Sequence, residues 1–148
     1  MSFPDDCIRG IVNPDCLVRV EGGLVADSNL FCFHGSSDQT DGWINESINW
    51  NDNDDVVGFT LGQKNADGTP QFTAGIAIIP LSELDRIKKR FPRGGYFDYE
   101  RAPIEANPYH GNLRLRENIE KRLKKTVRAA LALAAEIRPR EDVEYTQQ

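Results

Sequence analysis

The chain has 148 residues, a net charge of −5, 39% hydrophobic and 28% charged side chains, a composition that excludes disorder of its bulk and allows one buried core. No apolar run approaches the roughly 18 residues that a membrane span needs, and Asp5 and Asp6 stand where a signal peptide has apolar residues. We therefore expect a single cytoplasmic domain over residues 1–138, followed by a flexible polar tail over 139–148.

Charge and cysteine usage add two further expectations. Residues 1–75 hold 12 acidic and 3 basic side chains, a net −9, whereas residues 76–148 hold 11 and 15, a net +4. Such asymmetry suits self-association or a charged partner. The three cysteines, Cys7, Cys16 and Cys32, are an odd number in a chain without a secretion signal, which predicts free thiols.

The first half of the chain predicts short strands. Alternating or aromatic runs predict strands over 17–20, 30–33 and 43–50, and the Asn/Asp-rich run 51–55 predicts a surface turn. The apolar run 56–61 is expected to pair with 72–79 as a hairpin, because an Asp-Gly pair lies between them.

The second half predicts two helices. Ser82 is a good N-cap for an amphipathic helix over 82–91, and apolar residues at three- and four-residue steps predict a long helix over 117–137. Short strands are expected at 96–99 and 113–115.

These elements predict an α+β fold, in which an antiparallel sheet carries one short helix and a long C-terminal helix packed on one face. We expect the most apolar strand and the long helix to share one core. Its predicted members are Ile76, Ile78, Leu123, Val127 and Leu131.

Metal and cofactor motifs are missing. Cys7, Cys16, Cys32 and His34 form a nominal Cys₃His set, but no two cysteines have the C-x₂-C spacing typical of zinc sites. The acidic run that starts at Asn51 lacks the Gly and Glu of a calcium-binding EF-hand loop. Phosphate-loop, dinucleotide-binding, zinc-protease and serine-hydrolase motifs are absent as well. We predict no metal and no cofactor.

The most distinctive local sequence is 107–112, Asn-Pro-Tyr-His-Gly-Asn. A proline-restricted loop can present the side chains of Asn107 and Tyr109 and the titrating base of His110 to a ligand. The same residues can also form a structural turn. His34, the second histidine, follows the predicted aromatic strand and opens a Gly-Ser-Ser loop.

Two resemblances extend this interpretation. Arg9, early in the first strand, together with Ser28 resembles the start of ADP-ribosyltransferase-like folds over about a fifth of the chain. The resemblance implies that Arg9 holds an NAD pyrophosphate and that Glu100 or His110 is the catalytic residue, and a bidentate guanidinium suits that task.

The second resemblance spans most of residues 7–115. The segments CIRGI, SINW, GIAIIP and APIEANPYHGNL resemble an uncharacterised family of short bacterial proteins found near mobile-element or defence genes. This resemblance implies a bacterial cytosolic protein, and it implies that Arg9, Trp50, Asn107 and His110 are the positions of interest. It implies no reaction.

The long helix carries a basic face. Lys121, Lys124, Lys125 and Arg128 lie together, away from the apolar stripe. Such a face can bind an acidic protein surface or nucleic-acid phosphates, or be merely solvated. Because the chain is acidic overall and no aromatic residue interleaves these cations, a protein partner or a second copy is favoured over nucleic acid, and no membrane is expected.

Two functions follow as hypotheses. The first is a non-catalytic binding module that acts with a partner protein, in a bacterial defence or toxin–antitoxin system. The alternative is a small enzyme acting on a nucleotide (NAD-like) or an RNA phosphate through His110, His34 and Arg9. The sequence does not decide whether the protein is an enzyme. Convergence of these three residues, far apart in the chain, in one pocket would favour the alternative.

Overall fold

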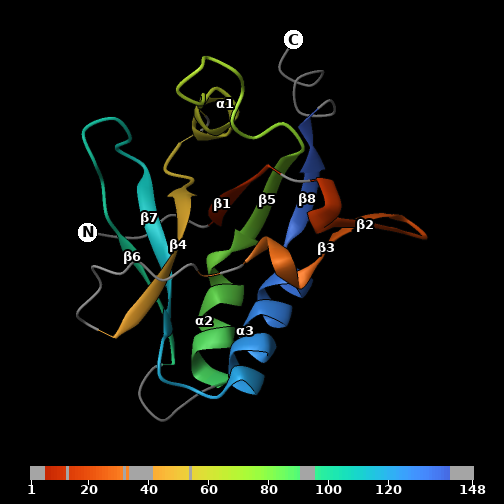
Figure 1. Cartoon of the computed structure of the whole chain (residues 1–148), viewed down its shortest axis with the longest axis vertical. Helices are drawn as coiled ribbons and strands as arrows, with labels where there is room; N and C mark the ends of the chain where they lie inside the picture. The colour runs from red at the N-terminus through yellow and green to blue at the C-terminus, as the bar shows by residue number, and fades with distance from the viewer. Residues whose placement is uncertain are drawn as a thin grey trace.

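A computed structural model describes residues 6–12, 14–31, 33, 42–53, 55–90 and 96–140. Its main feature is a six-stranded, fully antiparallel sheet with the strand order β6-β7-β4-β1-β5-β8 (Figure 1). The strands are β1 (Asp6–Ile11), β4 (Trp43–Trp50), β5 (Gly75–Pro80), β6 (Phe97–Arg101), β7 (His110–Arg116) and β8 (Glu136–Pro139). A separate two-stranded hairpin is formed by β2 (Leu17–Val20) and β3 (Gly23–Ala26).

One face of the sheet is covered by two helices, α2 (Leu81–Arg90) and α3 (Lys121–Ala134), which lie side by side in Figure 1. Leu84 and Ile87 of α2 and Val127 and Leu131 of α3 pack in the main core with inward residues of the strands. The α+β architecture, with a short helix and a long C-terminal helix packed on one face of an antiparallel sheet, is therefore confirmed.

The opposite face is covered only in part. Helix α1 (Val56–Leu61) closes a second, smaller core, in which Val56 and Leu61 pack on Ile8, Ile76 and Ile78. The predicted core was thus wrong in two respects. Ile76 and Ile78 lie on the opposite face of the sheet from Val127 and Leu131, and Leu123 is only partly buried.

The predicted hairpin between 56–61 and 72–79 is also wrong, because 56–61 is helical. Both edges of β5 are occupied, one by β1 and the other by β8. Residues 56–61 therefore cannot pair with β5 as predicted, and a helix lets Val56 and Leu61 cover the small core. Thr60 donates from its hydroxyl to the Val56 carbonyl, four residues earlier.

The C-terminal helix is shorter than the predicted 117–137. Ala135 is extended, with ψ 132°, and the chain turns into β8, where Ile137 pairs with Ala77. Pro139 belongs to this edge strand, and the Arg140 side chain donates to the carbonyls of Leu61 and Phe72. The first two residues of the predicted tail are therefore bound to the domain, and 141–148 lie outside the described residues.

The other predicted strands have mixed outcomes. The strands predicted at 17–20, 43–50, 96–99 and 113–115 correspond to β2, β4, β6 and β7. The strand predicted at 30–33 is wrong for the described residues, because Leu30 ends the 3₁₀ helix η2 (Ser28–Leu30) and Phe31 and Phe33 belong to no strand.

Candidate functional site

The candidate site forms where β1 and β4 separate. These strands pair only at Cys7 with Trp50 and at Ile8 with Asn49. Beyond that point β1 follows β5, and β4 follows β7. One edge of each strand is left without a strand partner, and the gap between them opens as a wedge.

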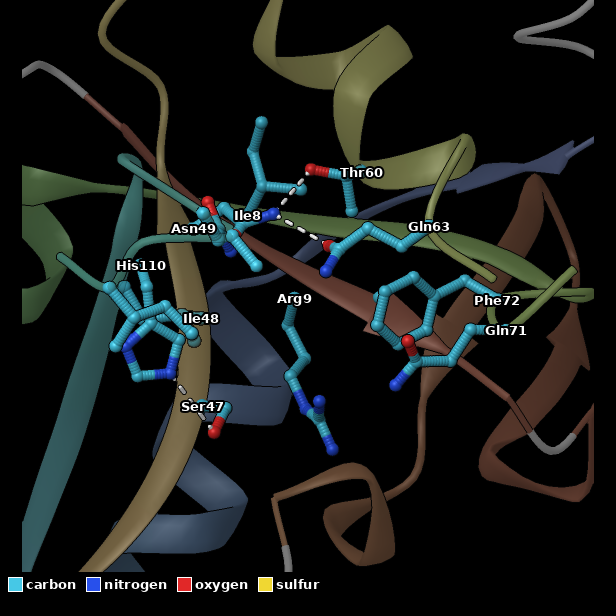
Figure 2. A pocket seen from close by; sticks show the side chains of 14 residues that line it. Ile8, Arg9, Ser47, Ile48, Asn49, Thr60, Gln63, Gln71, Phe72 and His110 are labelled. Atoms are coloured by element: carbon cyan, nitrogen blue, oxygen red, sulfur yellow. Dashed lines mark hydrogen bonds between the residues drawn. The ribbon is translucent and has the colours of Figure 1, made fainter. Parts of the chain in front are cut away.

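A pocket of about 260 Å³ lies at this wedge. Its walls come from β1, β4, the end of α1 with the segment after it, and the loop 102–110 (Figure 2). Its polar lining consists of Arg9, Ser47, Asn49, Thr60, Gln63, Gln71, Asn107 and His110. The Phe72 ring adds an aromatic wall, packed against Gly10, where a side chain would collide with it.

An ion pair bridges the wedge. Nη2 of Arg9 lies 2.5 Å from Oε1 of Glu46, and the Glu46 side chain is almost fully buried. The second carboxylate oxygen of Glu46 accepts the backbone N–H of Phe33 at 2.8 Å. Because Glu46 balances the charge of Arg9, the pocket carries little net charge.

A chain of amide groups forms the back wall. Asn107 donates to Asn49 Oδ1 at 2.8 Å, and Asn49 donates to Thr60 Oγ1 at 2.8 Å and to Gln63 Oε1 at 3.0 Å. Asn49, Thr60 and Asn107 are buried, so these bonds stabilise the wall. The amino group of Gln63 and the side-chain amide of Gln71 make no hydrogen bond within the described part of the chain, and they remain available to a ligand.

His110 presents a base to the same pocket. Its Nδ1 lies 2.8 Å from the Ala102 carbonyl oxygen. A carbonyl only accepts hydrogen bonds, so Nδ1 carries the proton of the neutral ring and Nε2 keeps its lone pair. Nε2 lies 3.4 Å from Ser47 Oγ, which must then be the donor.

The structure brings together part of the predicted site. Arg9 lines one pocket with Asn107 and His110, although it lies about 100 residues before them in the sequence. Tyr109 lies outside it and packs edge-on against Phe59, with 5.2 Å between the ring centroids. His34 lies outside the described residues.

The remaining predicted positions do not line this pocket. The α3 cations, Lys121, Lys124, Lys125 and Arg128, lie elsewhere, and Arg128 donates to Asn29 Oδ1 at 3.0 Å. Glu100 accepts from Asn112 at 2.9 Å, and the buried Trp50 ring donates to the Glu100 carbonyl at 3.0 Å. Ser28 belongs to η2, away from Arg9's pocket. Ser28, Trp50 and Glu100 thus lie outside the pocket that holds Arg9 and His110.

Six polar or aromatic lining residues were missed, Ser47, Asn49, Thr60, Gln63, Gln71 and Phe72. Ser47 and Asn49 carried a usable signal, because polar residues at alternate positions of a strand share one face. Thr60 belongs to the unforeseen helix α1, and Gln63, Gln71 and Phe72 come from the segment after it. No local pattern marks these four.

Among the residues that the structure describes, there is no group of three or more His, Cys, Asp or Glu side chains that could hold a metal ion. Cys7 is a buried free thiol, and burial raises its pKa to about 12. In the same part of the chain, no helix is both long and apolar enough to cross a membrane.

Comparison of this chain with protein-family models, with curated proteins and with solved structures finds no significant match.

Proposed function

We propose that the protein binds a small, uncharged, planar molecule that carries carbonyl and N–H groups, such as a nucleobase, a nucleoside or an aromatic carboxamide. One observation carries the proposal. Arg9, near the start of the chain, meets Asn107 and His110 in one pocket with the available Gln63 amino group, the Gln71 amide and an aromatic wall.

The charge balance favours an uncharged ligand. Glu46 holds one guanidinium nitrogen of Arg9 at 2.5 Å and offsets its positive charge. A phosphate placed beside Arg9 would also approach the Glu46 carboxylate, and like charges in a partly buried site repel strongly. The structure thus favours the uncharged portion of the nucleotide-type ligand predicted from the sequence over its phosphates.

The donors and acceptors favour a molecule with both kinds of group. Gln63 offers its amino group, Gln71 offers both its amino group and its carbonyl oxygen, and His110 offers the lone pair of Nε2. Amide side chains pair with carbonyl and N–H edges in two-centre geometry, as they do with bases. The Phe72 ring can cover an apolar face of such a ligand.

The size favours one ring system with a small substituent. The volume, about 260 Å³, lies just below the lower end, roughly 300 Å³, of pockets that hold drug-sized ligands. The partner-protein function, with its defence or toxin-related setting, stays a prediction from the sequence.

The test is a binding screen by thermal shift and calorimetry. Nucleobases, nucleosides and nicotinamide are compared with the matching 5′-phosphates, since a ligand that binds only the folded state raises its melting temperature. We expect at least one of the uncharged compounds to bind. The Gln71→Leu variant should bind it at least about tenfold more weakly, because it loses roughly one hydrogen bond to the ligand.

Lys64→Ala, an exposed change outside the pocket lining, is the matched control and should bind like the unaltered protein. Stabilisation by the phosphorylated compounds alone, or equal binding by Gln71→Leu, would contradict the proposal.

A further inference from the structure

We propose that Ser47 is a nucleophile activated by His110, and that the pocket transfers an acyl group from a small, uncharged aromatic ester or amide. This inference rests on the proposed function, because it assigns a reaction to the same pocket. It begins from one arrangement of three groups. Ser47 Oγ lies 3.4 Å from His110 Nε2, and His110 Nδ1 lies 2.8 Å from the Ala102 carbonyl oxygen.

The order of the hydrogen bonds determines the direction of proton transfer. The Ala102 carbonyl holds the proton on Nδ1, so the lone pair of Nε2 is directed at the serine hydroxyl. A nucleophile within reach of a base, with that base oriented by a third group, is the general arrangement of activated serines. The distance of 3.4 Å is long for a hydrogen bond, and catalytic contacts of this kind tighten when substrate binds.

The third group is itself held in place. The His110 carbonyl accepts the Ala102 backbone N–H at 3.0 Å, and Ile104 and Asn107 close the turn between them through two backbone bonds. The Asn107 side chain fastens this loop to Asn49 at 2.8 Å. The carbonyl that orients the imidazole is therefore part of a closed, internally bonded loop.

The serine is accessible. Ser47 is exposed and lies two residues before Asn49, the residue that pairs with His110 across β4 and β7. Ser47 and His110 are thus diagonal neighbours on the sheet face that borders the pocket. The Gln63 and Gln71 amino groups are donors in the same pocket for a carbonyl oxygen that becomes negative.

The reaction balances without a further reagent besides water. The Ser47 oxygen attacks the carbonyl carbon, and its proton moves to Nε2. The tetrahedral intermediate breaks its bond to the leaving alcohol or amine, which takes that proton from Nε2 and departs. Water then gives a proton to Nε2 as its oxygen attacks the acyl carbon. The bond between that carbon and Ser47 Oγ breaks, Oγ takes the proton back from Nε2, and the carboxylic acid leaves with Ser47 and His110 restored.

The first experiment uses a fluorophosphonate probe and p-nitrophenyl acetate on the full chain, with intact-mass and peptide mass spectrometry. We expect one adduct per chain, on Ser47, absent from Ser47→Ala. His110→Gln should slow its formation at least about 100-fold, the usual contribution of a positioned base. Ser82→Ala, which removes an exposed serine of α2, should leave the rate unchanged.

The second experiment replaces the nucleophile. In Ser47→Cys the new thiol should react with iodoacetamide faster than Cys16, and adding His110→Gln should remove that advantage, because a neighbouring base favours the thiolate. Melting temperatures of all variants check that they fold.

The outcomes separate the two proposals. No adduct on Ser47, an adduct on another residue, or a rate unchanged by His110→Gln would overturn the nucleophile, even if an uncharged ligand binds. Labelling of Ser47 that depends on His110, without binding of any screened compound, would support the nucleophile and contradict the ligand class proposed above.

Discussion

Arg9 and Glu46 form an ion pair, 2.5 Å between Nη2 and Oε1, across the point where β1 and β4 stop pairing. Strands in a sheet are normally joined by backbone bonds, and here a side-chain contact takes over. The Arg9 side chain keeps 22% of its surface exposed, whereas Glu46 is buried and also accepts the Phe33 N–H. The pair therefore joins the two halves of the sheet and lines the pocket at once.

We expect Glu46→Gln to destabilise the fold by about 3 kcal/mol, near the lower end of the range for breaking a buried ion pair, because Arg9 retains some water contact. Urea denaturation measures the loss. The control is Glu83→Gln, which breaks the exposed Arg86–Glu83 pair of α2 and should cost less than about 1 kcal/mol. Equal losses in the two variants would show that the wedge pair has no special structural role.

Two leucines on α3 provide a matched test of packing. Leu131 is fully buried in the main core, and Leu133, two residues later, is 90% exposed. Leu131→Ala should cost about 2–5 kcal/mol, from lost burial and the cavity left behind. Leu133→Ala should change stability by less than about 0.5 kcal/mol. Urea midpoints measure both changes, provided that the dependence of the unfolding free energy on denaturant is the same in each variant. A larger loss in Leu133→Ala than in Leu131→Ala would contradict the packing of α3.

Gly111 is required for a close approach on β7. A Cβ at this position would collide with the Trp50 indole nitrogen and with the Glu100 carbonyl oxygen, the two partners of one hydrogen bond. We expect Gly111→Ala to cost about 1–3 kcal/mol, as overpacking does, with a change in Trp50 fluorescence. Gly62→Ala, whose Cβ would lie 3.2 Å from the Gly58 carbonyl oxygen, should cost clearly less.

Stability should fall at alkaline pH. Burial raises the pKa of Cys7 from its ordinary 9.0 to about 12. Above pH 9 the unfolded chain loses this proton and the folded chain keeps it, so stability falls by up to about 1.4 kcal/mol per pH unit. Burial and a hydrogen bond to Asp85 also raise the pKa of Tyr99, and this shift lowers stability further above pH 10.

The measurement is the urea midpoint at several pH values between about 8 and 11. Cys7→Ala should reduce the fall in stability with pH that begins near pH 9. Tyr99→Phe should leave the fall between pH 9 and 10 unchanged. A Cys7→Ala variant with an unchanged alkaline slope would show that this thiol does not contribute.

Much of the fold follows from local patterns in the sequence. Short apolar and aromatic runs predict β4, β6 and β7, and the spacing of Leu84 and Ile87 predicts α2 close to its observed bounds. These elements bury one face against a continuous core, so their periodicity reports their structure directly. The loop that holds Asn107 and His110 was also found, because its proline and polar residues differ from their surroundings.

Other features depended on neighbours that the sequence does not display. Residues 56–61 have a strand-like composition but are helical, because β1 and β8 already occupy both edges of β5. Ile137 continues the spacing of α3, yet it pairs with Ala77 as part of a strand. In both places long-range pairing overrode local propensity.

The pocket shows the same division. The sequence by itself determined which residues are polar on β4 and in the loop before β7, and it indicated Arg9, Asn107 and His110 separately. Only the tertiary structure decided that they meet, because β1 and β4 separate after two residue pairs and Gln63, Gln71 and Phe72 close the gap. Where two strands diverge depends on the partners on their outer edges, β5 and β7, and strand pairing between distant segments is a property of the whole sheet.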